Sequence, residues 1–145
     1  MDASVAVKWA VANEPWREHA LALLQDAGTA GTVLIAPGLY LAEVDSVIRK
    51  RAYFASLTPT EVAQAYSILD VAPVIPVEMG SLRPRARSIA EQLNQRLVYD
   101  SLYAALAEAR GCEFWTADEE FYKKARHSLP YVRLLPDYPV PPSSE

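Results

Sequence analysis

One stretch of the sequence, residues 98–118, constrains the fold of this chain more than any other. Apolar residues recur at helical spacing from Leu102 to Ala109, and Gly111 stands where a helix would end. The residues that follow, Glu113–Ala117, predict a short strand. A helix that leads directly into a strand is typical of proteins with parallel sheets.

Acidic residues mark both ends of this unit. Asp100 opens the predicted helix, and Asp118 closes the predicted strand. A helix start and the following strand end lie at the same edge of a parallel sheet, where open α/β sheets bind ligands. We therefore expect the two acids to face each other, which suggests a metal site. The alternative is that each acid only caps a helix, and Thr116 with Glu119 offers a competing capping box around Asp118.

The rest of the chain alternates between strand and helix patterns with short connections. The alternation of Val5, Val7 and Trp9 alone favours a strand near the start. The other patterns predict helices at Trp16–Ala27, Pro37–Tyr53, Pro59–Leu69 (capped by Thr58), Ser81–Gln95 and Glu119–Arg126, and strands at Thr32–Ala36, Val74–Val77 and Val132–Leu135. This order predicts an α/β fold with a mostly parallel sheet and helices on both faces.

Length and composition indicate one globular domain. The chain has 145 residues, of which 51% are hydrophobic and 22% charged, enough for a core of its own. We assign residues 1–135 to the domain and expect the Pro-rich tail, residues 136–145, to be unstructured. We expect neither a signal peptide nor a membrane span. The net charge of -4 counts mildly against nucleic acid, although a bound cation would neutralise an acidic centre.

The single cysteine, Cys112, excludes an internal disulfide and a cysteine-based zinc cluster. It fits a reducing cytoplasm, and we interpret it as a small core residue. We expect His19 and His127 at the surface. Neither histidine is therefore placed to act as the catalytic group in place of a metal ion.

Two further acids extend the set. Glu43 lies on the helix predicted to begin at the same edge, and Leu39 and Val47, at i-4 and i+4, place it on the inward face. A carboxylate on an apolar face is costly unless something pairs with it. Asp2 lies at the start of the chain with Ser4 beside it.

Four segments together resemble the acidic signatures of the PIN domain. They are DASVAVKW from Asp2, Pro37–Glu43, the helix opened by Tyr99-Asp100, and Thr116-Ala-Asp118, in the family's order and at its usual intervals as far as about Leu135. Within the family, the chain looks like the VapC-like toxins of prokaryotic toxin–antitoxin pairs. The resemblance implies a three-layer α/β/α sandwich, a Mg²⁺- or Mn²⁺-dependent endoribonuclease, a homodimer and a cognate antitoxin.

The resemblance also implies roles for individual residues. The catalytic, metal-binding acids would be Asp2, Glu43, Asp100 and Asp118, supported by hydrogen bonds from Ser4 and Thr116, with Glu120 as an optional further acid. The family commonly has Asn three residues after the helical acid, whereas this chain has Ser46.

Clustered carboxylates can do this chemistry on physical grounds alone. Carboxylates are hard oxygen ligands that suit Mg²⁺ or Mn²⁺, and such a cation lowers the pKa of a bound water and neutralises charge on a phosphodiester. The candidates for phosphate contacts are Lys8, Arg49, Lys50 and Arg51, although the last three equally suit a solvated helix end. Aromatic residues that could line a dimer or antitoxin surface, or pack in the core, are Trp9, Trp16, Tyr40, Tyr53, Phe54 and Tyr66.

Two other functions are weighed against a cytoplasmic ribonuclease toxin. The first is a PIN fold that binds RNA or a partner without cutting. The second is a metal-dependent phosphatase of another α/β family, which is disfavoured because those sites usually show D-x-D after the first strand and position 4 here is Ser4.

The start of the chain carries an expectation of its own. Only Met1 precedes Asp2, whereas a parallel strand needs about five residues. We expect residues of a first, apolar strand upstream of Met1. The alternative is that Ala3–Trp9 serves as this strand, which would carry Asp2 to the opposite end of the sheet.

Overall fold

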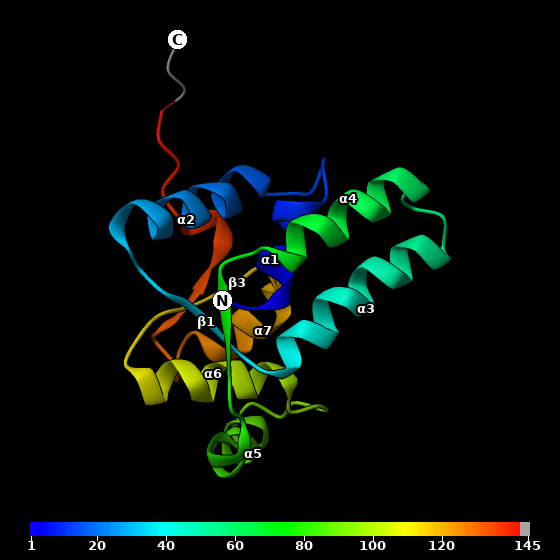
Figure 1. The fold of residues 1–145 in the computed structure, drawn as a ribbon. Coiled ribbons are helices and arrows are strands. Elements are labelled where there is room, and N and C mark those ends of the chain that lie inside the picture. Colours follow the sequence, from blue (N-terminus) through cyan, green and yellow to red (C-terminus); the bar gives the residue numbers. More distant parts are fainter. Residues whose placement is uncertain (143–145) are drawn as a thin grey trace.

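A computed structural model describes residues 1–142 (Figure 1). The helices are α1 (Ala3–Ala10), α2 (Arg17–Ala30), α3 (Leu39–Tyr53), α4 (Pro59–Asp70), α5 (Arg83–Gln92), α6 (Tyr99–Arg110) and α7 (Glu119–Ala125). The strands are β1 (Leu34–Pro37), β2 (Val74–Val77), β3 (Phe114–Thr116) and β4 (Val132–Leu134), and short 3-10 turns are η1 (Gly80–Leu82) and η2 (Leu135–Asp137). Among the described residues, no helix is long and apolar enough to cross a membrane.

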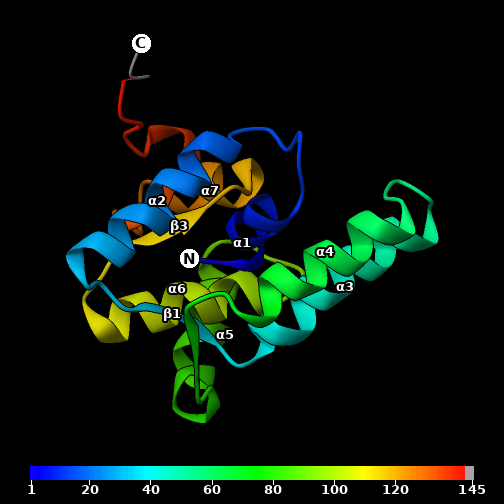
Figure 2. The same cartoon turned by 45° about the horizontal axis from the view of Figure 1, so that its top comes forward.

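The strands form two parallel pairs. Strand β1 pairs with β2, with Leu34 opposite Val74, and β3 pairs with β4, with Phe114 opposite Val132. Helix α2 lies on one side of the strands, and α5 and α6 lie on the other (Figures 1 and 2). This arrangement confirms the predicted α/β class with parallel strands. It differs from a continuous sheet because no strand of the described chain joins β1 to β3.

The start of the chain corrects the strand pattern. Ala3–Ala10 is a helix, so the alternative that Ala3–Trp9 serves as a central strand is wrong. Val5, Val7 and Trp9 alternate, but Ala6 between them and Ala3 before them are apolar and buried as well. A segment that is apolar all round is typical of a buried helix, and α1 packs against α2, α3 and α4.

Local signals set the ends of two helices as predicted. Thr58 forms a full capping box with Glu61, and Pro59 occupies the first position of α4. Gly111 ends α6 in the left-handed conformation, with φ of 62°. Helices α3 and α4 pack against each other and project from the rest of the molecule (Figure 2).

The expected unstructured tail is wrong for its first residues. Residues 135–137 form η2, and the ring of Tyr138 packs edge-on against Trp115 with ring centroids 5.0 Å apart. The Tyr138 hydroxyl donates a hydrogen bond to Asp26 on α2 (2.8 Å), and its carbonyl lies 2.7 Å from His19 Nδ1. Aromatic packing against a strand therefore outweighs the proline content here.

Candidate functional site

Asp2 is the most enclosed acid of the set, with 4% of its surface exposed. It stands directly before α1 with an extended backbone, and hydroxyl groups satisfy both oxygens of its carboxylate. Ser4 Oγ donates to Oδ1 (2.5 Å), and Thr116 Oγ1 donates to Oδ2 (2.6 Å). Burial raises the pKa of Asp2, the two hydrogen bonds lower it, and the net shift is upward.

The same two hydroxyls tie the end of β3 to the start of the chain. Ser4 Oγ accepts from the backbone N–H of Ala117 (3.0 Å), and Thr116 Oγ1 accepts from that of Asp118 (3.0 Å). Asp118 is also the N-cap of α7, because its Oδ1 accepts from the N–H of Phe121 (3.0 Å). Capping therefore engages one oxygen of this half-buried carboxylate.

Asp100 lies in the first turn of α6 and is half-buried. Burial raises its pKa to about 7, and the negative charges of Asp2, Asp118 and Glu43 act in the same direction. Since these effects require short range, the four predicted acids share one region of the molecule. They come from the start of α1, from α3, from α6 and from the end of β3.

Glu43 lies in the second turn of α3 and is half-buried on the inward side, as its apolar neighbours predicted. Its Oε1 atom is buried and has no hydrogen-bond partner among the described residues. Burial raises its pKa to about 6; the nearby Tyr103 hydroxyl opposes this rise, and the charge of Asp2 adds to it. An unpaired buried carboxylate oxygen is costly, and it is the kind of atom that a cation would satisfy.

Sequence reasoning missed Tyr103. Its hydroxyl is buried without a hydrogen-bond partner in the described chain. Burial raises its pKa strongly, and the charges of Glu43 and Asp2 contribute, so the ring lies beside the acids. The available signal was its position three residues after Asp100, on the same face of α6.

The residues fit a divalent cation in donor chemistry and charge. Several carboxylates repel one another in a partly enclosed region, and hard oxygen donors are the ligands that Mg²⁺ and Mn²⁺ prefer. Within residues 1–142, however, no three acids, histidines or cysteines lie close enough together to hold a metal ion as they stand. The fit therefore rests on the donor set and the unpaired Glu43 oxygen, and not on preformed ligand geometry.

Basic residues divide into a buried and an exposed group. Lys8 is only 7% exposed, and its ammonium group pairs with Glu14 (3.4 Å) and lies 5.7 Å from the centre of the Trp16 ring. Glu14 also pairs with Arg51. These contacts occupy Lys8, so we do not assign it to phosphate binding. Arg49 is exposed near the end of α3.

The remaining candidates lie at the surface. Glu120 is exposed on α7. Cys112 is also exposed, which corrects its assignment to the core. His127 is exposed and His19 is partly buried.

Comparison with known proteins identifies the family. No curated protein matches this chain. A family model for the PIN domain matches residues 1–127, which include the four acids, their two hydroxyl partners and Tyr103. PIN domains are generally metal-dependent nucleases. Because the match covers most of its length, the chain belongs to the PIN domain family.

Proposed function

We propose that this protein is a Mg²⁺- or Mn²⁺-dependent endoribonuclease and the toxin of a cytoplasmic toxin–antitoxin pair. The raised pKa of Asp100 is the observation that best supports the proposed catalytic activity. Its pKa is raised to about 7 by burial and then by the charges of three other acids. A protein gains nothing in stability from gathering four carboxylates in this way, so the grouping supports a role in binding a cation.

The chain's own residues would divide the work. Asp2, Glu43, Asp100 and Asp118 would hold the cation, which supplies a water of lowered pKa and neutralises charge on the phosphodiester. Ser4 and Thr116 orient the Asp2 carboxylate by donating to both of its oxygens, and these hydrogen bonds favour its ionised form against the effect of burial. Arg49 would contact the RNA backbone, since it is exposed and Lys8 is not available.

Exposed aromatic residues support the proposed partners. Tyr53 and Phe54, at the end of α3, are 71% and 64% exposed and pack edge-on against each other. Exposed aromatic side chains are enriched at protein interfaces. Trp9 and Tyr40 are buried and belong to the core. We therefore propose that the projecting α3–α4 pair contributes to a homodimer or antitoxin interface.

Cleavage of RNA by the purified protein tests the catalytic proposal. We expect cleavage with Mn²⁺, none with chelator, and none from Asp100→Asn. Asp45→Asn is the matched control, because Asp45 is an exposed acid two residues from Glu43 on α3. We expect this variant to cleave RNA like the wild type. RNA binding without cleavage in Mn²⁺ would instead favour the non-cleaving module. Wild-type cleavage by Asp100→Asn would contradict the assignment of the site.

A further inference from the structure

The segment that leads into Asp100 exposes three consecutive apolar residues. Leu97, Val98 and Tyr99 are each at least 40% exposed. The first two end the loop of residues 93–98 that joins α5 to α6, and Tyr99 is the first residue of α6 (Figure 1). Single exposed apolar residues are normal on a protein surface, whereas a contiguous group marks an interaction site. This group lies directly beside one of the proposed metal-binding acids.

The backbone holds the α5–α6 loop in a defined shape. Leu93 is buried at the end of α5, and Asn94 adopts the left-handed conformation, with φ of 51°. Asn is one of the few residues that adopt this conformation readily. The N–H of Gln95 donates to the carbonyl of Ala90 (2.8 Å), which closes the turn. A loop ordered in this way loses little conformational entropy when it binds a ligand.

The helix before the loop is rich in arginine. Residues 83–99 contain four arginines and one acid, in a chain whose net charge is -4. Arg85 is paired at two points with an acid of α6 (2.7 and 3.0 Å). Arg83, Arg87 and Arg96 are exposed and have no ion-pair partner among residues 1–142. Unpaired cations next to an acidic centre attract a polyanion to it.

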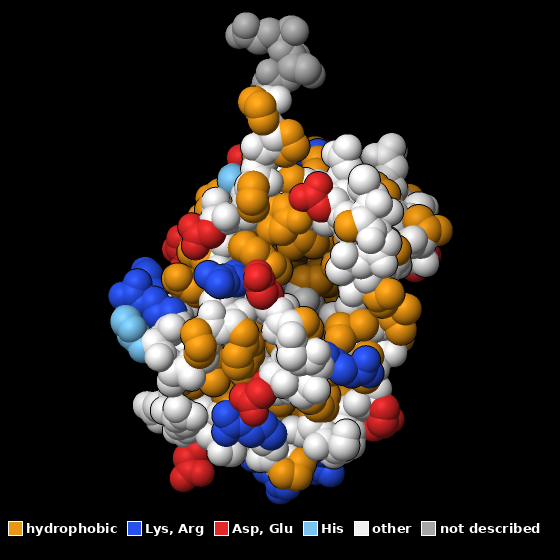
Figure 3. Space-filling view, turned by 90° about the vertical axis from the view of Figure 1, so that its left-hand side faces the viewer, with side chains coloured by type: hydrophobic (Ala, Val, Ile, Leu, Met, Phe, Trp, Pro, Cys, Tyr) orange, Lys and Arg blue, Asp and Glu red, His pale blue; other side chains and the backbone are white. Residues whose placement is uncertain are grey.

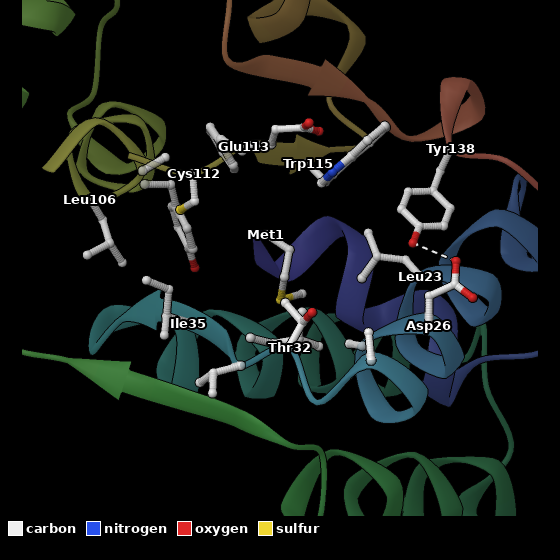
Figure 4. Close-up of a pocket in the computed structure, with 17 residues that line it drawn as sticks. Met1, Leu23, Asp26, Thr32, Ile35, Leu106, Cys112, Glu113, Trp115 and Tyr138 are labelled. Atoms are coloured by element: carbon white, nitrogen blue, oxygen red, sulfur yellow. Dashed lines mark hydrogen bonds between the residues drawn. The ribbon is translucent and has the colours of Figure 1, made fainter. Parts of the chain in front are cut away.

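The apolar cleft between β1 and β3 has the opposite character. It has a volume of about 340 Å³, and Figure 4 shows Leu23, Ile35 and Leu106 around it. Hydrophobic side chains also gather around a hollow on the face shown in Figure 3. The charged side chains that line the cleft are the acids Asp26 and Glu113, without a lysine or arginine from the described part of the chain. A polyanion is therefore drawn to the α5–α6 loop and not to this cleft.

We propose that Tyr99 stacks on a base of single-stranded RNA and that Arg96 holds an adjoining phosphate, on one side of the bond that is cleaved. This inference rests on the proposed nuclease function, because it places the substrate beside Asp100. The Cα atoms of consecutive residues are about 3.8 Å apart, so a base on Tyr99 brings its own phosphates close to the acids.

This pair of contacts also defines the kind of RNA that is bound. An exposed aromatic ring and a nearby arginine are the elements with which proteins hold single strands, and stacking accepts any base because every base has a π-face. Bases inside a duplex are stacked on one another and are closed to such a ring. The α5–α6 loop therefore selects unpaired RNA without reading its sequence.

Fluorescence anisotropy of a labelled oligonucleotide in chelator tests the stacking contact without cleavage. One probe is an unpaired RNA, and the other is a chain of the same length that lacks every base. Tyr99→Leu should weaken binding of the RNA about tenfold and leave binding of the abasic chain unchanged. Tyr99→Phe keeps the ring and should bind both probes like the wild type. Tyr53→Leu is the matched control, because Tyr53 is an exposed tyrosine at the far end of α3.

The same probes test the phosphate contact. Arg96→Gln should weaken binding of both probes to the same extent, and it should lower the slope of log Kd against log salt by about one. Arg110→Gln is the matched control, because Arg110 is an exposed arginine at the opposite end of α6. It removes the same charge from the protein and should leave the affinity and the salt slope of the wild type.

Three outcomes would overturn the inference. They are wild-type RNA binding by Tyr99→Leu, an equal loss for both probes in that variant, and a wild-type protein that binds neither probe. A smaller species of Tyr99→Leu in gel filtration, without a base-dependent loss, would overturn it too and assign the loop to an interface between copies. RNA cleavage in Mn²⁺ with unchanged binding by Tyr99→Leu would leave the proposed function standing. A base-dependent loss in a protein that does not cleave would support the inference and contradict the nuclease.

Discussion

Replacement of Asp100 by Asn should stabilise the metal-free protein at neutral and alkaline pH. The ordinary pKa of this carboxyl is 3.8, and burial with three neighbouring acids raises it to about 7 in the fold. At about 1.4 kcal/mol per pKa unit, this difference sets an upper limit of about 4 kcal/mol. Solvent screening of a half-buried group reduces the expected gain to about 1–2 kcal/mol.

The pH dependence of the pKa effect determines whether Asp100→Asn is more or less stable than the wild type. A carboxyl whose pKa is raised on folding binds more protons in the folded state than in the unfolded state between about pH 4 and pH 7. Its contribution to stability is therefore greatest below about pH 4 and is lost as pH rises through about 7. Asn carries no charge at any pH. The two proteins should have equal stability near pH 4, and the variant should lead by about 1–2 kcal/mol at pH 8.

Urea denaturation in chelator at pH 4.5, 6 and 8 measures this difference. Asp45→Asn is again the matched control, because it makes the same chemical change at an exposed position of α3. A constant difference between Asp100→Asn and wild type at all three pH values would refute the reasoning. So would a variant that is less stable than the wild type at pH 8.

Three further predictions concern the same region and one helix end. Thr116→Val should cost about 1–3 kcal/mol by denaturation, because it leaves a buried Asp2 oxygen unpaired, whereas Thr116→Ser should be close to wild type. Calorimetry should show Mn²⁺ binding that strengthens between about pH 6 and pH 8, because Glu43 and Asp100 must release protons there; pH-independent binding would contradict this. Thr58→Ala should lower stability by about 1 kcal/mol through loss of the capping box, and an unchanged urea midpoint would contradict it.

Local chemistry made much of the fold predictable. The Thr58 capping box and the left-handed end at Gly111 depend on interactions within one turn, so the sequence contains the whole signal. The alternation of Val5, Val7 and Trp9 was misleading because burial on all sides removes the difference between a strand and a helix. Tyr138 shows a related limit, since its contacts with Trp115, Asp26 and His19 are with residues far from it in the sequence.

The sequence named the four acids of the candidate site, but not Tyr103 and not all of the hydrogen bonds around the acids. Asp100 and Asp118 follow from a helix start and a strand end, Glu43 follows from its apolar neighbours on α3, and Asp2 was assigned through the family resemblance. Ser4 and Thr116 each donate a hydrogen bond to Asp2 and accept one from a backbone N–H beyond β3. These bonds form only when segments more than a hundred residues apart in the sequence meet. The position of the buried Tyr103 hydroxyl beside the acids likewise depends on the approach of Glu43 from α3, which the local sequence does not show.

The four acids limit their mutual repulsion in different ways. Asp2, the most buried, receives hydrogen bonds on both oxygens, which favour its ionised form against the cost of burial. One carboxylate oxygen of Asp118 accepts a hydrogen bond at the N-terminus of α7. Glu43 and Asp100 have raised pKa values of about 6 and about 7, so protons remove part of their charge near neutrality. A divalent cation would replace those protons, and Glu43 and Asp100 would be the acids whose protonation changes most when it binds.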